Sequence, residues 1–147
     1  ETNRTIYGSR ILVTGFGRLS KLLAPRLAAL GADLHIAARK QADLAFIEAY
    51  GYTPHHFNTL KNIAGGFDIL INTVPAMVFP AEVISKLRED AVLIDLASAP
   101  GGVDFEAAWK KGVTAVQALS LPGKVAPYSA AQIILSTIFN IIKEEKT

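Results

Sequence analysis

Short apolar runs and amphipathic segments alternate along this chain of 147 residues. Continuous apolar runs, typical of strands buried on both faces, occupy residues 11–13, 34–38, 67–73, 91–96 and 113–118. A weaker run at residues 53–57 contains Pro54, which a central strand would not accept, so we expect an edge strand there. Segments with helical spacing of apolar residues lie at residues 19–30, 41–50, 60–64, 80–87, 105–111 and 126–142.

This alternation of strand and helix predicts an α/β domain with a doubly wound parallel sheet, which is the Rossmann fold. Right-handed crossovers then give the strand order 3-2-1-4-5-6. We expect one domain over residues 1–147. The chain begins with Glu1 and its only methionine is Met77, so we also expect a processed or excised segment of a longer protein.

Several helical segments carry signals for their ends and their apolar faces. Asp104 is expected to cap the helix at residues 105–111, and Gly112 to end it. Phe105 and Trp109 lie one turn apart in that helix, and we expect both in the core. The apolar face of the first helix is expected to consist of its regularly spaced leucines, Leu19, Leu22, Leu23, Leu27 and Leu30.

Two glycines separate the first apolar run from the first helix. Gly15 and Gly17 form the start of a G-x-G-x-x-G pattern, in which Ser20 takes the third glycine position. Backbone N–H groups at such a helix start, together with the helix dipole, bind a pyrophosphate. We therefore expect a dinucleotide to contact the turn and the first residues of the helix, namely Gly15, Phe16, Gly17, Arg18 and Leu19.

The end of the second apolar run indicates which dinucleotide fits. NAD-binding domains usually place Asp or Glu about twenty residues after the glycines, where its carboxylate binds the ribose hydroxyls. Here that position falls near Ala38 and is followed by Arg39 and Lys40. Because two cations suit the additional phosphate of NADP, we expect these three residues to bind NADP, with NAD as the alternative cofactor. A basic loop exposed to solvent is the competing interpretation.

Further cofactor contacts are expected beyond the carboxyl ends of the later strands, where ligands bind in open α/β sheets. The residues there are small or polar and suit the ribose and the nicotinamide: Asn72, Thr73, Val74, Pro75, Asp95, Leu96, Ala97, Ser98, Leu121 and Pro122. Asn72 and Asp95 equally fit a structural role in which their side chains bind loop amides.

Composition and charge exclude several other classes of function. The formal net charge is only +2 and the basic residues are scattered, so we expect neither a nucleic acid nor a membrane as partner. The absence of cysteine excludes disulfides and thiolate sites. His35, His55 and His56 are expected to be structural rather than catalytic, and no cluster of ligating residues predicts a metal site.

Five segments of the chain resemble the dipicolinate synthase family, in particular the nucleotide-binding domain in the first of that enzyme's two subunits. They are GFGRLS at residues 15–20, AARK at 37–40, INTVPA at 71–76, IDLASAPGGVDF at 94–105 and LSLPGKVAPYSAAQI at 119–133. The last two are the most specific, whereas the glycine motif also occurs in the NAD(P)-binding domains of 2-hydroxyacid dehydrogenases and their relatives. The segment around Leu121 and Pro122 is also similar to the loop near the nicotinamide in alanine dehydrogenases.

The resemblance implies an NADP- or NAD-dependent oxidoreductase that oxidises a small-molecule substrate, dihydrodipicolinate, to dipicolinate. Its implied partner is the second subunit of dipicolinate synthase, which is flavoprotein-like. The resemblance also implies dipicolinic acid biosynthesis during sporulation, in the cytoplasm of the mother cell. Family members carry an N-terminal substrate domain that is apparently absent from this chain. We therefore expect this chain alone to bind cofactor with little or no turnover, and we assign no catalytic residue. Homo-oligomer formation remains open.

Two other functions fit the same residues. The chain could be the cofactor domain of a 2-hydroxyacid or alanine dehydrogenase, although no His follows the sixth apolar run, which disfavours the hydroxyacid version. It could also be a nucleotide-sensing Rossmann module without redox chemistry, but many such modules keep an acidic residue where this chain has Ala38 and Arg39.

Overall fold

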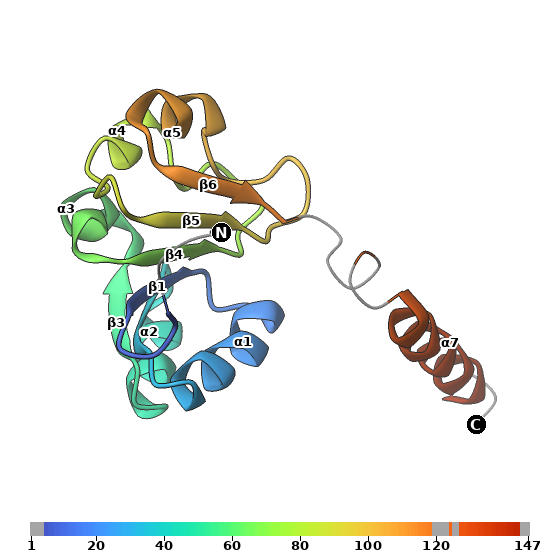
Figure 1. Ribbon diagram of the computed structural model, residues 1–147. Helices are drawn as coiled ribbons and strands as arrows, with labels where there is room; N and C mark the ends of the chain where they lie inside the picture. The colour runs from blue at the N-terminus through green and yellow to red at the C-terminus, as the bar shows by residue number, and fades with distance from the viewer. Residues whose placement is uncertain (1–4, 119–123, 125–126, 145–147) are drawn as a thin grey trace.

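Six parallel strands form one sheet in the order β3-β2-β1-β4-β5-β6 (Figure 1). The computed structural model describes residues 5–118, 124 and 127–144. The strands are β1 (Arg10–Thr14), β2 (Asp33–Ala38), β3 (Thr53–His56), β4 (Ile69–Asn72), β5 (Val92–Asp95) and β6 (Thr114–Gln117). Both the order and the parallel pairing confirm the predicted Rossmann fold. The edge position of β3 explains how Pro54 is accepted in a strand.

Helices cover both faces of the sheet (Figure 1). One face carries α1 (Arg18–Ala29) and α2 (Gln41–Ala49). The other carries α3 (Leu60–Ile63), α4 (Ala81–Ile84) and α5 (Phe105–Lys111), and the 3₁₀ turns η1 (Phe57–Thr59) and η2 (Ala64–Gly66) flank α3. A final helix, α7 (Pro127–Glu144), exposes its described large apolar side chains, among them Ile133 and Ile134. Within the described residues, no helix has both the length and the apolar character needed to cross a bilayer.

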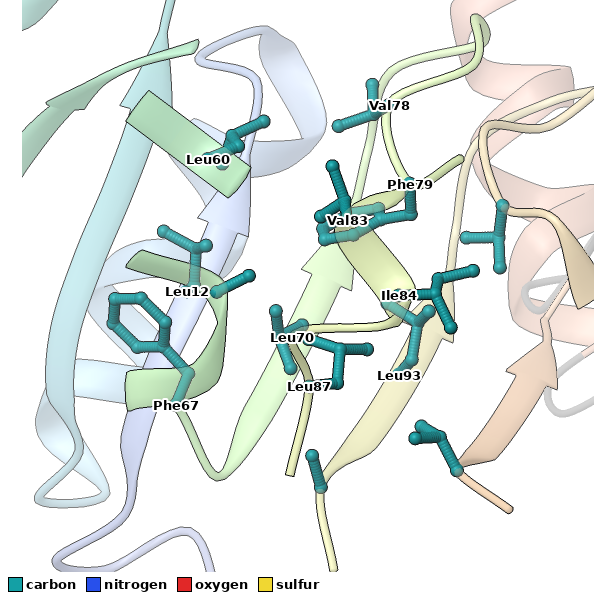
Figure 2. Close-up of a cluster of buried hydrophobic side chains, with 14 of the residues drawn as sticks. Leu12, Leu60, Phe67, Leu70, Val78, Phe79, Val83, Ile84, Leu87 and Leu93 are labelled. Atoms are coloured by element: carbon teal, nitrogen blue, oxygen red, sulfur yellow. The ribbon is translucent and has the colours of Figure 1, made fainter. Parts of the chain in front are cut away.

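Alternating residues of the central strands divide the core into two clusters. Leu12, Leu70 and Leu93 point toward α3, α4 and α5, where Figure 2 shows them packed with Phe67 and Phe79. Their neighbours along the same strands, such as Ile11 and Ile71, point to the opposite face and pack with residues of α1 and α2. Both faces of the strands are therefore buried, which is why their sequences are continuously apolar.

The buried face of α1 differs from the apolar face that its leucines predicted. Leu19, Leu22 and Leu30 are exposed, whereas Ser20 and Ala24 are among the buried residues. Only small side chains fit where the helix approaches the sheet closely behind the glycine turn. Spacing alone therefore located the helix correctly but not the side that faces the sheet.

Two expectations for the helices after β4 were also inaccurate. The predicted helix at residues 80–87 is shorter, because α4 ends at Ile84 and Pro80 precedes it as an extended N-cap residue. In α5, the Asp104 carboxylate accepts a hydrogen bond from the Ala107 N–H and Gly112 ends the helix in a left-handed conformation, as predicted. The core position expected for Trp109 is wrong, since its side chain is 80% exposed.

Trp109 is exposed because α5 turns a different side toward the sheet. Ala108 is fully buried, and Phe105, three residues earlier, packs partly buried against the same cluster. Positions 105 and 108 therefore define the buried side of this short helix, and position 109 lies beside it.

Candidate nucleotide-binding site

The turn between β1 and α1 requires glycine at one position and leaves open space at the other. Gly15 has a φ of 95°, and a Cβ atom there would lie 2.7 Å from both Thr73 Oγ1 and Val74 Cγ2. Its N–H donates a 2.8 Å hydrogen bond to the Ala37 carbonyl of the neighbouring strand. Gly17 has an ordinary φ of −85°, and no atom lies within 4 Å of a Cβ built on it. The fold therefore explains Gly15, whereas Gly17 leaves room beside the backbone for a ligand.

The start of α1 has the properties of an anion-binding site. Gly17 is the N-cap residue, no side chain caps this end, and the first turn contains no acidic residue. The first N–H groups of a helix have no partner within the helix, and the helix dipole adds partial positive charge there. Ser20 is fully buried in this turn, and its Oγ has no hydrogen-bond partner among the described residues.

A groove of about 220 Å³ connects the glycine turn with the ends of β2 and β3. Its lining includes the turn itself and the residues after the two strands: Gly15, Phe16, Ala38, Arg39, Lys40, Asp43, Phe57 and Val74. Ala38 is buried, whereas Arg39 and Lys40 are exposed, and neither cation forms an ion pair in the described part of the chain. This end of the groove is therefore open and positively charged.

Two contacts hold the Arg39 region in place. The Arg39 guanidinium carbon lies 5.2 Å from the centroid of the Phe57 ring, close enough for a cation–π contact. Below it, the His56 Nε2 atom lies 3.1 Å from the Arg39 carbonyl oxygen. In the tautomer that carries its proton on Nε2, His56 donates a hydrogen bond to this carbonyl. The end of β3 therefore supports the backbone on which the two cations stand.

The sequence did not identify Phe57 and Asp43 as parts of this groove. Phe57 comes from η1, and its contact with Arg39 depends on the parallel pairing of β2 with β3. Asp43 lies in the first turn of α2, where an acidic residue is common at any helix start. A usable signal was that Phe57 directly follows a predicted strand at the same sheet edge as Arg39.

A buried polar network joins the carboxyl ends of the three central strands. Thr14, Asn72 and Asp95 are neighbours across β1, β4 and β5, and all three are fully buried. The Thr14 hydroxyl donates to Asn72 Oδ1 over 2.9 Å, and Asn72 Nδ2 donates to Asp95 Oδ1 over 2.8 Å. Asn72 also bonds both the N–H and the carbonyl of Val74.

Asp95 extends this network to the loop after β5. Its Oδ1 accepts a hydrogen bond from the Ala97 N–H, and its Oδ2 accepts one from the Gly102 N–H. A Cβ on Gly102 would lie 2.4 Å from Asn72 Nδ2 and from the Ala76 carbonyl oxygen, so glycine is required there. These contacts are those of the structural role considered for Asn72 and Asp95, in which they hold the strand ends. Direct contact of either side chain with a cofactor stays a prediction.

The other predicted residues at this edge lie on the two loops that the network holds. The Thr73 hydroxyl donates to the Thr14 carbonyl, and the Leu96 N–H donates to the Asn72 carbonyl. Pro75 and Ser98 are exposed on the same loops, next to Val74 and Ala97. Leu121 and Pro122 lie outside the described residues. Their contact with a cofactor stays a prediction, like that of the remaining candidates.

The three histidines interact with each other and with neighbouring strands. His35 Nδ1 lies 2.9 Å from His55 Nε2, and the two rings stack beside Phe67. Burial lowers the pKa of His55, and the positive charges of His35, when protonated, and Arg10 lower it further. The described residues contain no group of three or more metal-ligating side chains.

An uncapped helix start behind a glycine turn, at the carboxyl edge of a sheet with this order, defines a nucleotide-binding domain of the dehydrogenase type. The chain belongs to the D-isomer specific 2-hydroxyacid dehydrogenase family by its NAD-binding domain, since the model of that domain matches residues 1–108. This match supports a nicotinamide cofactor.

The predicted resemblance to dipicolinate synthase is confirmed. A dipicolinate synthase subunit from Bacillus subtilis is 41% identical over 144 residues, which are 98% of this chain and 48% of the relative. Its crystal structure superimposes with a TM-score of 0.94 over 97% of this chain and 48% of the relative. The corresponding dipicolinate synthase subunit from Bacillus halodurans gives 0.91 at 38% identity, over 95% and 48%. The chain thus spans about half the length of these relatives.

A more distant similarity concerns the fold alone. An L-alanine dehydrogenase superimposes with a TM-score of 0.73 over 92% of this chain and 43% of that protein, at 17% identity.

Proposed function

We propose that this chain is the NADP-binding domain in the first subunit of a dipicolinate synthase, and that the complete protein oxidises dihydrodipicolinate to dipicolinate. The observation that carries this proposal is the 41% identity to the Bacillus subtilis protein, because it extends over 98% of the chain. The broader family of 2-hydroxyacid dehydrogenases accounts only for residues 1–108. The similarity to dipicolinate synthase therefore includes the C-terminal part that the broader family does not explain.

In this proposal the cofactor lies along the carboxyl edge of the sheet. The pyrophosphate is bound over Gly17 by the N–H groups of Arg18 and Leu19, where the helix dipole favours an anion. The 2′-phosphate is bound by Arg39 and Lys40, because these exposed cations have no carboxylate partner in the described part of the chain and Arg offers a planar pair of donors.

The nicotinamide end is assigned to the loops that Asn72 and Asp95 hold. Bound NADP⁺ supplies a hydride acceptor, so that loss of a hydride and a proton converts the dihydropyridine ring of the substrate into an aromatic pyridine. The loops after β4 and β5 orient the ring of the cofactor, and the buried network keeps these loops in place without itself reacting. We assign substrate positioning to the part of the relatives that this chain does not span, and a second subunit to the complete enzyme, as the name of the relative implies.

Equilibrium titration of this chain with NADPH and NADH tests the cofactor assignment. We expect NADPH to bind at least about tenfold more tightly, because a charge-assisted contact to the extra phosphate contributes about 1.5–3 kcal/mol. The Arg39→Ala variant should lose most of this difference while its affinity for NADH changes little. Lys86→Ala is the matched control, since Lys86 is an exposed lysine outside the groove. Equal affinity of the unmodified chain for both nucleotides would refute the NADP assignment.

The reaction itself needs a separate experiment. The nucleotide-binding chain is joined to the remaining half of the first dipicolinate synthase subunit, mixed with the second subunit, and supplied with enzymatically generated dihydrodipicolinate and NADP⁺. Formation of dipicolinate, followed by its ultraviolet absorbance, is the expected result. Absence of product with a chain that binds NADPH normally would contradict the proposed reaction and leave the cofactor site intact.

A further inference from the structure

A second pocket lies between α1 and the end of α2, outside the nucleotide groove. It has a volume of about 230 Å³ and is lined by Phe16, Lys21, Ala24, Pro25, Tyr50 and Tyr52. Of these residues only Phe16 also lines the groove with Arg39 and Lys40. We propose that this pocket binds a planar aromatic carboxylate, with the ring among the three aromatic side chains and the carboxylate on Lys21.

The arrangement of the three rings suits one further ring. The Phe16 and Tyr50 centroids are 6.3 Å apart with planes tilted by 49°, and Tyr50 and Tyr52 are 6.4 Å apart and tilted by 43°. Tilted aromatic rings at such spacing leave faces and edges free for additional edge-to-face or offset contacts. The volume lies below the range of about 300–1,000 Å³ that is usual for larger ligands, which favours a single ring.

The charge in the pocket favours an anion. The Lys21 ammonium nitrogen lies 4.9 Å from the centroid of the Phe16 ring, so the cation is held at the edge of the aromatic wall. Lys21 forms no ion pair in the part of the chain that the structure describes, and no acidic residue lines the pocket. A carboxylate at this position would gain a charge-assisted contact that no side chain of the pocket provides.

The remaining walls explain why the ligand is expected to be flat. Ala24 and Pro25 form an apolar side on α1, whereas Tyr50 is 61% exposed and closes the pocket only in part. A ring that enters this space covers apolar surface of Tyr50 that is otherwise in contact with water. The dipicolinate of the proposed function is a pyridine with two carboxylates and belongs to this chemical class, but the assignment does not require that function.

The test uses sodium benzoate as the probe and NMR titration of the ¹⁵N-labelled chain as the measurement. Saturable shifts are expected for backbone amides of Lys21, Ala24, Tyr50 and Tyr52. Cyclohexanecarboxylate has the same charge without the aromatic ring and should bind at least about fivefold more weakly. Shifts that are absent from these residues, or equal affinity for the two carboxylates, would overturn the proposal.

Two variants separate the contributions of charge and ring. Lys21→Met keeps most of the side-chain stem and should weaken benzoate binding about tenfold, whereas Lys86→Met, which removes an exposed lysine elsewhere, should leave it unchanged. Tyr50→Leu should also weaken binding, and its exposed position makes a loss of folding easy to distinguish by the unfolding midpoint. Equal effects of Lys21→Met and Lys86→Met would overturn the assignment of the carboxylate to Lys21.

A competition arm distinguishes this pocket from the nucleotide groove. Because the two share only Phe16, benzoate affinity should stay within about threefold when NADPH is added in excess over the protein. Displacement of benzoate by NADPH would place the ring in the groove of Arg39 and overturn the proposal. A chain that failed to bind NADPH would refute the cofactor assignment while leaving the benzoate result valid.

Discussion

Replacement of Asp95 by Asn tests whether a buried carboxylate holds the strand ends beneath the candidate site. Asp95 is fully buried, and its two oxygens accept three N–H groups, from the Asn72 side chain and from the backbone of Ala97 and Gly102. Asn offers one acceptor oxygen and one N–H₂ group. In either orientation, at least one of the three donors would therefore face N–H₂ instead of oxygen.

The magnitude follows from these contacts. In the less damaging orientation the N–H₂ group faces Gly102, so one hydrogen bond to a charged group, worth about 1.5–3 kcal/mol, is lost. The new N–H₂ group also stays without an acceptor, while removal of a buried charge offsets part of the loss. We expect the free energy of unfolding to fall by about 2 kcal/mol, a large share of the roughly 5–15 kcal/mol that is typical of native proteins.

Urea denaturation at pH 7, followed by far-ultraviolet circular dichroism, measures this change. Glu89→Gln is the matched control, because it removes an exposed carboxylate and should alter stability by less than about 0.5 kcal/mol. Asp95→Ala leaves all three donors without their acceptor and should be at least as destabilising as Asp95→Asn. If Asp95→Asn were as stable as the unmodified chain, the carboxylate would not be needed to hold the loops, and the account of the network would be wrong.

Two further predictions concern the glycine turn and the histidine pair. Gly17→Ala should change the free energy of unfolding by less than about 1 kcal/mol, since the added methyl meets no atom within 4 Å, yet it should weaken NADPH binding at least tenfold in an equilibrium titration. Unchanged binding would show that no phosphate approaches this backbone. His55 has a lowered pKa in the folded chain, so the unfolded chain takes up a proton more readily, and stability should fall as the pH decreases through about 6.5. Urea titrations at several pH values should show a smaller fall for His55→Gln, and identical slopes would count against this explanation.

The sheet could be predicted from the sequence because its strands are buried on both faces. Continuous apolar runs mark such strands, and the positions of Gly15 and Pro54 then fixed the nucleotide turn and the edge strand. The buried face of α1 could not be predicted in the same way. Leucine spacing describes how apolar a face is, whereas the close approach behind the glycine turn selects the small side chains of Ser20 and Ala24.

The candidate site was predictable only where its residues adjoin a strand end in sequence. Arg39 directly follows β2 and was found, whereas its contact with Phe57 depends on a pairing between strands that are 14 residues apart from end to start. The two roles considered for Asp95 were equally consistent with the sequence, because both place a polar residue after an apolar run. Only the three N–H groups that surround its carboxylate identify the structural contacts.

The site separates the residues that hold its shape from those assigned to cofactor choice. Asn72 and Asp95 are fully buried and bonded across the central strands, so changes there should reduce stability and cofactor binding together. Arg39 and Lys40 are exposed beyond the end of β2, so changes there should alter the preference between NADPH and NADH without unfolding the sheet. Surface substitutions away from buried contacts usually change stability by less than about 0.5 kcal/mol. Cofactor preference can therefore be altered at this edge while the strands that carry the glycine turn stay in place.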